Sequence, residues 1–344
     1  MLTTTIGSYP KPSFVTVPGF IAKHPNPTAR YSEWLKGRTA EDIKNIEKAS
    51  QQIVRTQCEC GIDVPTDGEA PREHYIYYHL RHLEGIDFEN LSKTSLRNNT
   101  WSALVPTVRG KIRAGDPFLP HDYKVAQSAA VNPVKITVPG PFTIVGTTAN
   151  EFYPDSKSLC FDLADALNVE IRRLAEAGCR YIQVDEPVFA RQPQQALEWG
   201  FEALERCFAG VPNEVNRVIH MCCGYPERLN QEDYAKADRT AYFDLADAIE
   251  RSSIDAVSIE DAHQKNDLKL LEKFQKTTII LGVVHIANTR VETVEEIRTR
   301  LQQALEHIDP ARLIAGPDCG LGMLDEDTVV KKMTNLALAA HSFS

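Results

Sequence analysis

The stretch KSLCFDLADALNVEIRRLAEA (157–177), GCR (178–180), YIQVD (181–185) reads as a helix followed by a strand. Apolar residues recur at helical spacing up to Gly178, a typical helix-ending residue, and a short β-branched run then begins. A second helix is expected at 293–308, where Thr293 and Glu296 form a capping-box pattern. Strand-like segments lie at 2–8, 62–67, 134–138, 181–185, 217–222, 256–260, 278–285 and 312–316.

Eight strands that alternate with helices predict a parallel sheet with crossover helices. The fold class is therefore α/β, and a (β/α)8 TIM barrel that occupies residues 1–344 as a single domain is expected. An open doubly wound sheet is the alternative. Three segments do not fit the repeat, at about 9–38, 84–133 and 224–240. Loops that follow strands lie over the C-terminal face of a barrel, so the first and third of these insertions are expected to shape a pocket or a lid, with surface decoration as the alternative.

Composition limits the classes of function. The 344 residues are 42% hydrophobic and 25% charged, with a formal net charge of −9, which suits a globular enzyme and disfavours a nucleic-acid partner. No apolar run approaches the roughly 20 residues that span a bilayer, and the first residues lack the pattern of a signal peptide. A cytoplasmic protein without a membrane partner is expected, and its eight cysteines are expected to be reduced.

Four ligand-type residues follow three of the predicted strands. His220 and Cys222 lie near the end of RVIHMCC (217–223), Glu260 lies near the end of AVSIED (256–261), and Cys319 ends RLIAGPDC (312–319). The ends of parallel strands meet at one face of a sheet, and two thiolates, an imidazole and a carboxylate suit Zn²⁺. The sequence therefore predicts a catalytic zinc site. Cys223 is expected to point away from it, because successive strand residues face opposite sides.

Dispersed motifs in a fixed order carry a family resemblance. They are IGSYP (6–10), DGE (67–69), GPFTI (140–144), QVDEP (183–187), HMC (220–222), SIE (258–260), VH (284–285) and PDCG (317–320). Over nearly its whole length the chain resembles the C-terminal catalytic barrel of cobalamin-independent methionine synthase. The resemblance implies zinc-dependent methyl transfer to L-homocysteine, with His220, Cys222, Glu260 and Cys319 as the zinc ligands.

The resemblance also assigns the substrate residues. Ile6 and Ser8 are expected to cradle the homocysteine backbone, Glu69 and Asp185 to meet its ammonium, and His285 to act as the catalytic proton donor. The chemistry agrees with these roles, because carboxylates bind a primary ammonium through charge-assisted hydrogen bonds and histidine changes charge near neutral pH. Glu69 as a helix N-terminal acid and His285 as a hydrogen-bonded spacer are the structural alternatives.

Residues near these motifs allow further expectations. His263 is expected to hydrogen-bond Glu260 or substrate, and Glu186 to position its loop. The run REHYIYYHL (72–80) is expected either to line the pocket or to form an exposed helix face.

The methyl donor is expected to differ from methyltetrahydrofolate. The family's N-terminal barrel, which helps to bind the folate, has no counterpart in these residues, and Thr147 stands where the family usually has a tryptophan that stacks on the pterin. The chain resembles single-barrel relatives that use another donor, such as a methylated corrinoid protein or another carrier. Two alternative functions remain: alkyl transfer to a different thiol, as in epoxide-thiol transferases, and non-catalytic binding of zinc or a methyl carrier.

Overall fold

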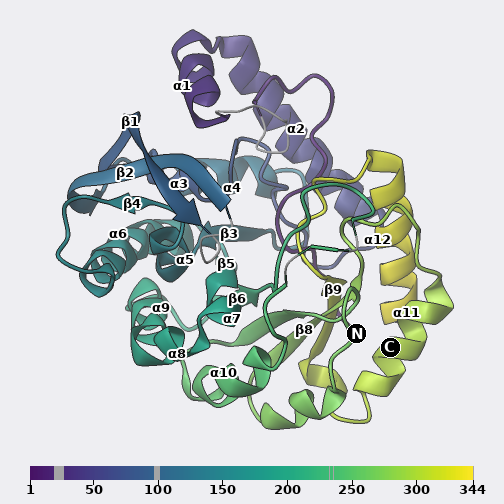
Figure 1. The fold of residues 1–344 in the computed structure, drawn as a ribbon. Coiled ribbons are helices and arrows are strands. Elements are labelled where there is room, and N and C mark those ends of the chain that lie inside the picture. Colours follow the sequence, from purple (N-terminus) through teal and green to yellow (C-terminus); the bar gives the residue numbers. More distant parts are fainter. Residues whose placement is uncertain (19–26, 97–100, 232, 235, 344) are drawn as a thin grey trace.

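A parallel sheet forms the centre of the molecule (Figure 1). The structure is a computed structural model that describes residues 1–18, 27–96, 101–231, 233–234 and 236–343. Neighbouring strands of the sheet follow the order β3-β5-β6-β7-β8-β9, and every pair is parallel. These strands are β3 (Lys135–Pro139), β5 (Tyr181–Asp185), β6 (Asn216–Met221), β7 (Ala256–Glu260), β8 (Thr278–Val284) and β9 (Leu313–Pro317).

Single parallel bridges continue the sheet from β9 back to β3. Thr3 bridges Ala315 in β9, Thr4 bridges Val64, and Thr66 bridges Lys135 in β3. Backbone hydrogen bonds accompany these bridges, including Thr4 N to Ala315 O at 3.0 Å and Lys135 N to the Pro65 oxygen at 2.8 Å. The eight expected strand positions are therefore joined in a ring, which agrees with the predicted barrel.

The predicted strands at 2–8 and 62–67 are much shorter than expected. Pro65 has no N–H to donate to a neighbouring strand. Side chains also satisfy polar groups that a regular ladder would pair, because Gln57 accepts hydrogen bonds from the Thr5 hydroxyl (2.5 Å) and the Thr66 backbone N–H (3.0 Å). Local side-chain bonding of this kind competes with regular secondary structure.

Helices surround the sheet (Figure 1). They are α1 (Pro27–Gly37), α2 (Ala40–Glu59), α3 (Tyr77–Leu80), α4 (Leu119–Gln127), α5 (Pro141–Val145), α6 (Ser156–Glu176), α7 (Pro187–Arg191), α8 (Pro193–Gln195), α9 (Phe201–Cys207), α10 (Ala241–Arg251), α11 (Val294–Ala304) and α12 (Glu326–His341), with a π-helix at Ala196–Gly200 and 3-10 helices at Leu268–Lys273 and Pro310–Arg312.

The helix predicted at 157–177 forms as α6. Asp155 caps α6 by accepting a hydrogen bond from Ser158 N at 2.7 Å, and Gly178 follows the helix with a φ of +104° that favours glycine. Leu163, Leu167 and Leu174 of α6 are buried, each contributing roughly 1.5–3 kcal/mol. The predicted capping box of Thr293 and Glu296 is present at α11, which ends at Ala304 rather than 308.

The segment 84–133 contains a second sheet. Strands β1 (Leu83–Leu96) and β2 (Trp101–Ala114) form an antiparallel hairpin, and β4 (Ala149–Asn150) pairs with β2. Helix α4, also within this segment, packs against α2 and α6. The hairpin is thus the part that departs from the strand-helix repeat, whereas α4 belongs to the surrounding layer of helices.

The interior of the ring changes from apolar to polar along the strands. Ile6, Val218, Ala256 and Ile280 form a small buried cluster of their own. Two residues beyond Val218 in β6 lies His220, and two beyond Ala256 in β7 lies Ser258. Alternate strand residues share a face, so a polar layer follows the apolar one toward the C-terminal ends of the strands.

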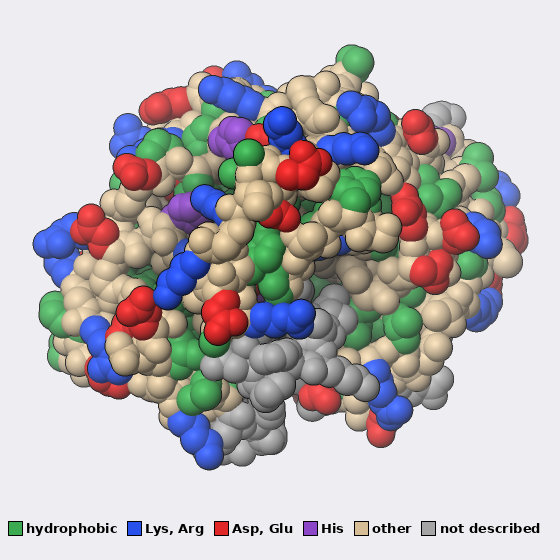
Figure 2. All heavy atoms as spheres, turned by 90° about the horizontal axis from the view of Figure 1, so that it is seen from above, with side chains coloured by type: hydrophobic (Ala, Val, Ile, Leu, Met, Phe, Trp, Pro, Cys, Tyr) green, Lys and Arg blue, Asp and Glu red, His purple; other side chains and the backbone are tan. Residues whose placement is uncertain are grey.

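Two observations concern the rest of the molecule. No helix among the described residues is long and apolar enough to cross a membrane. On the face seen in Figure 2, acidic and basic side chains are interspersed.

Candidate active site

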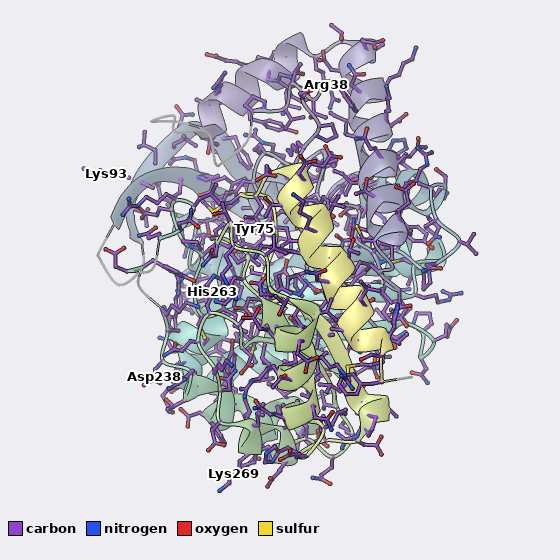
Figure 3. The ribbon with its side chains drawn as sticks, turned by 90° about the vertical axis from the view of Figure 1, so that its right-hand side faces the viewer. Arg38, Tyr75, Lys93, Asp238, His263 and Lys269 are labelled. Atoms are coloured by element: carbon purple, nitrogen blue, oxygen red, sulfur yellow. The ribbon has the colours of Figure 1, made fainter. Side chains whose placement is uncertain are left out.

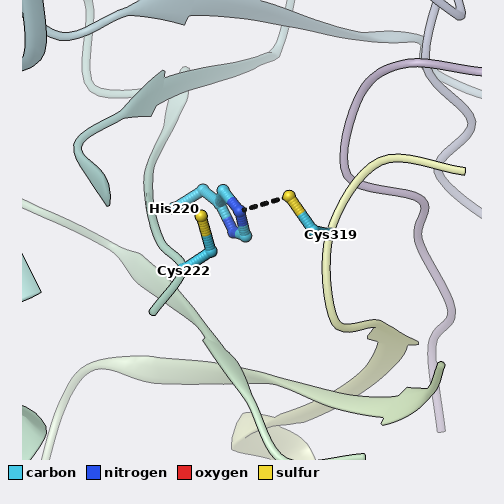
Figure 4. Close-up of side chains that lie close together, drawn as sticks. All are labelled: His220, Cys222 and Cys319. Carbon is cyan, nitrogen blue, oxygen red and sulfur yellow. Dashed lines mark hydrogen bonds between the residues drawn. The ribbon is translucent and has the colours of Figure 1, made fainter. Parts of the chain in front are cut away.

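Three of the four predicted metal ligands come together at the ends of β6 and β9 (Figure 4). One ligand atom from each of His220, Cys222 and Cys319 lies within 4.8 Å of the others. The Cys319 sulfur is 3.4 Å from His220 Nε2, and His220 and Cys222 are buried. One imidazole and two sulfurs are donors that Zn²⁺ commonly takes in proteins, so this set fits zinc.

A hydrogen bond fixes the direction of the histidine ring. His220 Nδ1 lies 3.0 Å from the hydroxyl oxygen of Ser258, in the neighbouring strand β7. This contact directs Nε2 toward the two cysteines. Metal-bound histidines usually have such a partner on their second nitrogen, which fixes the tautomer and the ring orientation.

The cluster favours a thiolate. The hydrogen bond from Cys319 lowers the pKa of the Cys222 thiol well below its ordinary value, against the opposing effect of burial. The same hydrogen bond raises the pKa of Cys319. Burial opposes protonation of His220, but its contact with Cys222 raises its pKa. The hydrogen bonds therefore favour the ionised form of Cys222 and the protonated forms of Cys319 and His220. A divalent cation would compensate the negative charge of two thiolates here.

Glu260 lies outside this three-ligand cluster. Its Oε2 accepts a hydrogen bond from Lys236 Nζ at 2.8 Å, and its Oε1 accepts one from Cys223 N at 3.1 Å. Burial, and then the negative charge of Cys222, raise the pKa of Glu260 to about 8. The carboxylate is near enough to Cys222 to sense its charge, but in this structure its partner is a lysine.

Cys223 points away from the cluster, as predicted. Its sulfur donates to the Tyr242 hydroxyl at 3.3 Å, and its side chain is buried against α10. The alternation of side chains along the chain thus separates two adjacent cysteines.

The predicted substrate residues Ile6 and Asp185 are connected through one glutamine. Gln183 Nε2 donates to the Ile6 carbonyl oxygen at 2.9 Å and to Asp185 Oδ1 at 2.7 Å. A Cβ added to Gly320, which follows Cys319, would collide with Ser8 Oγ. The predicted residues of the IGSYP and QVDEP motifs therefore meet beside the cluster of His220, Cys222 and Cys319.

Glu69 approaches the same region from the DGE motif. Its Oε1 accepts hydrogen bonds from Thr137 (2.8 Å) and Arg72 (3.3 Å), and a Cβ on Gly7 would lie only 2.8 Å from this oxygen. Glu69 has a φ of +56°, in the left-handed region that is uncommon for residues other than glycine. Such backbone strain is frequent in binding sites, where the surrounding structure holds it in place.

The buried carboxylates of Glu69 and Asp185 lie close enough for their charges to interact. Burial raises the pKa of Asp185 to about 7, and the charge of Glu69 adds to the effect. Burial also raises the pKa of Glu69, against the attraction of Arg72. A substrate ammonium would relieve this repulsion, so the pair favours a cationic ligand.

Glu186 positions a loop, in agreement with the prediction. Its carboxylate accepts hydrogen bonds from Phe142 N (3.0 Å), from Thr143 N (2.8 Å) and from the Thr143 hydroxyl (2.7 Å). It therefore holds the GPFTI segment at the start of α5.

His285 stands at the end of β8 with a carboxylate behind it. Its Nδ1 is 3.0 Å from Glu292 Oε1, and its backbone N donates to the same oxygen at 3.0 Å. Glu292 Oε2 accepts from Lys332 Nζ at 2.8 Å, and Lys332 is fully buried. This arrangement fixes the orientation of the His285 ring.

His263 does not make the expected hydrogen bond to Glu260. Its Nδ1 lies 2.6 Å from Asp318 Oδ2, and Asp318 also accepts the backbone N–H of His263 at 2.7 Å. The His263 and His285 rings meet edge to face, with centroids 4.6 Å apart. Asp318 precedes Cys319, so its carboxylate reaches the loop after β7, which explains the difference.

Aromatic side chains from two segments border the site. Tyr75 belongs to the run 72–80, and the charges of Cys222, Asp185 and Cys319 add to burial in raising the pKa of its hydroxyl. Tyr225, in the 224–240 segment, donates to the Gly320 carbonyl at 3.2 Å. Figure 3 places Tyr75 and His263 toward the middle of the molecule, with Lys93, Asp238 and Lys269 at its edge. Tyr75 thus lies near the site, and most of the run 72–80 is buried rather than forming an exposed helix face.

Thr147 is tied to its own helix turn. Its hydroxyl donates to the carbonyl oxygens of Thr143 and Ile144, both at 3.0 Å. Its own carbonyl accepts a hydrogen bond from Tyr77 at 3.3 Å. No aromatic platform is provided by this side chain.

Sequence reasoning missed several contributors to the site: Gln183, Lys236, Ser258 and Glu292. Gln183 and Ser258 lie inside motifs that had been singled out, two residues before a predicted site residue, so strand alternation could have found them. Lys236 and Glu292 lie in loops without periodicity and gave no comparable signal.

Comparisons with known proteins bear on the whole chain. Residues 1–342 match the family model described as cobalamin-independent synthase, catalytic domain. The methionine synthase of Sulfolobus acidocaldarius is 29% identical over 339 residues, which cover 97% of this chain and 89% of that protein. The methionine synthase of Pyrococcus furiosus is 28% identical over 341 residues, covering 98% and 91%.

Solved structures are also similar to this chain over nearly its whole length. A B12-independent methionine synthase from Shewanella sp. W3-18-1, in complex with selenomethionine, has a TM-score of 0.88 at 26% identity, and the match covers 99% of this chain and 97% of that one. A putative vitamin-B12 independent methionine synthase from Listeria monocytogenes has a TM-score of 0.72 at 19% identity and shares the fold.

Proposed function

The chain belongs to the cobalamin-independent methionine synthase family, and we propose that it transfers a methyl group to the sulfur of L-homocysteine with the help of zinc. The observation that carries the proposal is the cluster of His220, Cys222 and Cys319 beside two buried carboxylates. A zinc ion held by this cluster would lower the pKa of a substrate thiol and keep it as a nucleophilic thiolate. Glu260 is the fourth candidate ligand.

The protein groups around the cluster suit the amino-acid end of homocysteine. Glu69 and Asp185 would accept hydrogen bonds from the ammonium, and Ile6 and Ser8 would flank the substrate backbone. The selenomethionine of the Shewanella structure is the selenium analogue of the expected product and has the same amino-acid end. A thiol without an ammonium would leave the two carboxylates uncompensated, which disfavours the epoxide-thiol alternative.

His285 would supply the proton that the leaving group of the methyl donor requires. Its Nδ1–H is held by Glu292, so Nε2 is the nitrogen available to substrate. General acids contribute roughly 10²–10⁴-fold to rate when they are placed in this way.

The donor we propose is not methyltetrahydrofolate but a methylated carrier, such as a corrinoid protein. The supporting observation is Thr147, whose hydroxyl is engaged within its own helix turn and offers no surface on which a pterin could stack. Saturable methyl transfer from free methyltetrahydrofolate by the purified chain would contradict this part of the proposal. A cytoplasmic location, in which the eight free cysteines stay reduced, completes the proposal.

The experiment that tests the central claim is zinc-edge X-ray absorption with and without L-homocysteine. We expect two sulfur ligands in the free protein and three in the presence of substrate. A shell of two sulfurs that does not change at saturating homocysteine would contradict thiol activation at this cluster.

A further inference from the structure

The amino-acid end of the proposed substrate carries a carboxylate as well as an ammonium. Glu69 and Asp185 would accept hydrogen bonds from the ammonium, but these two side chains are buried and, with the ionised form of Cys222, make the site negative. A carboxylate is stable in such surroundings only where several hydrogen bonds are directed at it. Recognition of the whole amino acid therefore requires hydrogen-bond donors at a second point of the pocket.

Ser8 offers two donors of this kind. Its backbone N–H has no hydrogen-bond acceptor among the residues that the structure describes. Its carbonyl oxygen accepts a hydrogen bond from Leu321 N at 2.7 Å, which ties Ser8 to the loop that follows Cys319. A side chain at Gly320 would collide with the Ser8 hydroxyl, so glycine at this position allows the close approach. Ser8 is thus held beside the end of β9.

The Tyr225 hydroxyl is a third donor beside Ser8. It donates to the Gly320 carbonyl at 3.2 Å and is hydrogen-bonded to the Ser8 hydroxyl. Burial raises the pKa of the Tyr225 hydroxyl, and the charge of Cys319 adds to the effect. The hydroxyl therefore remains protonated, and able to donate, at neutral pH.

Tyr225 lies between the two halves of the site. The charge of Glu69, which belongs to the pocket for the ammonium, acts on its hydroxyl, and so does the charge of Cys222, which belongs to the cluster. Its two neighbours in the chain, Gly224 and Pro226, are both buried, so the backbone on either side of Tyr225 is packed into the protein. A substrate that extends from the ammonium pocket to the cluster would pass this hydroxyl.

The bond from Tyr225 to the Gly320 carbonyl is long for a contact between oxygen atoms. It measures 3.2 Å, whereas O–H···O bonds are typically about 2.7–2.8 Å long. A carboxylate is a stronger acceptor than a neutral carbonyl, and hydrogen bonds to it are shorter. A carboxylate that accepts from Ser8 would therefore compete well for the Tyr225 hydroxyl.

We propose that Tyr225 is a specificity-determining residue that donates a hydrogen bond to the carboxylate of the amino-acid substrate, beside the backbone N–H and hydroxyl of Ser8. This inference rests on the proposed function, and it adds to it the residue that distinguishes an amino-acid thiol from a simple aminothiol. It also gives the first residues of the 224–240 segment a role beyond covering the site.

Tyr225→Phe tests the proposal with two ligands, L-homocysteine and 3-aminopropane-1-thiol, which lacks only the carboxylate. Calorimetric titration of the zinc protein gives the Kd of each. The substitution should raise the Kd for L-homocysteine roughly 10–100-fold, because one hydrogen bond to a charged group is lost. The Kd for 3-aminopropane-1-thiol should not change. In the methyl-transfer assay, the KM for L-homocysteine should rise more than kcat falls.

Tyr123→Phe is the matched control. The Tyr123 hydroxyl also donates to a glycine carbonyl, that of Gly178 at 3.0 Å. Gly178 precedes β5, so this hydrogen bond lies at the opposite end of the sheet from the site. Its removal should leave the Kd of both ligands unchanged. Binding of 3-aminopropane-1-thiol by Tyr225→Phe with the affinity of the wild type would show that the altered site is still folded.

An unchanged Kd for L-homocysteine in Tyr225→Phe would overturn the inference. Equal weakening of the two ligands would overturn it as well, because the hydroxyl would then act on something other than the carboxylate. The proposed function is judged separately, on the wild type alone. A wild type that binds no L-homocysteine would contradict that function, and the inference would fall with it.

Discussion

Replacing Glu292 by glutamine should both destabilise the protein and slow its reaction. The carboxylate accepts hydrogen bonds from His285 on one oxygen and from the fully buried Lys332 on the other. An amide can place its oxygen toward only one of these donors, so its NH2 group would face the other. The substitution therefore leaves a buried donor without a partner and a buried ammonium without a counter-ion.

The structure gives the size of this effect. Burial opposes ionisation of Glu292, but the hydrogen bonds from His285 and Lys332 lower its pKa from 4.5 to about 2. At 1.36 kcal/mol per pKa unit, this difference corresponds to ~3 kcal/mol of unfolding free energy. Loss of one partner from a buried pair costs a comparable 3–5 kcal/mol. For a chain of 344 residues, ~3 kcal/mol lowers Tm by about 4 °C.

The assay is thermal and denaturant unfolding of the wild type and Glu292→Gln at several pH values. Because the folded-state pKa of Glu292 is depressed, its contribution is present above its ordinary pKa of 4.5 and is lost as pH falls toward about 2. The stability gap between the two proteins should therefore be widest near neutral pH and narrow below pH 4.5.

Glu295→Gln provides the control for this experiment. Glu295 lies in the first turn of α11 and pairs with Arg298, but its side chain is 75% exposed, so its replacement should change stability by less than about 1 kcal/mol. Methyl-transfer activity measured well below Tm should fall in Glu292→Gln and remain in Glu295→Gln. Equal stability of the two variants near neutral pH would show that Glu292 does not contribute the expected ~3 kcal/mol.

Three further substitutions test the site. Cys222→Ser should lose nearly all bound zinc while Cys223→Ser keeps it, as measured by metal analysis of the purified proteins; equal zinc contents would remove Cys222 from the ligand set. Glu69→Gln should raise the KM for homocysteine roughly 10–100-fold with zinc content unchanged, because one charge-assisted hydrogen bond is lost. An unaltered KM would separate Glu69 from ammonium binding. His285→Asn should lower kcat by about 100-fold or more while retaining zinc, and unchanged turnover would exclude it as the proton donor.

The fold could be predicted from local pattern where the pattern is long. Helix α6 and strand β5 follow from apolar spacing and from Gly178 at the end of the helix, whereas the cap at Asp155 was not foreseen. Closure of the ring through Thr4 and Thr66 was harder to predict, because these residues pair by single bridges. The segment around Thr66 also depends on hydrogen bonds from the Gln57 side chain, which no local sequence pattern indicates. The β1–β2 hairpin likewise appeared only as a segment outside the repeat.

The candidate site followed from one geometric rule, that the ends of parallel strands meet. This rule predicts the convergence of His220 with Cys319, residues far apart in sequence. The rule does not predict which cation pairs with a given carboxylate, and the ion pair of Glu260 with Lys236 was therefore not foreseen. The same limit applies to His263, which bonds Asp318 because of loop geometry rather than sequence spacing.

The bridge from Thr3 to Ala315 has a consequence for the order of assembly during synthesis. The segment that carries Ile6 and Ser8 is synthesised long before β9, the strand beside it. Closure of so distant a pair is slow, and a partly made barrel exposes unpaired strand edges. The proposed pocket for the amino-acid end of the substrate therefore cannot be complete until β9 has been synthesised and has paired with this segment.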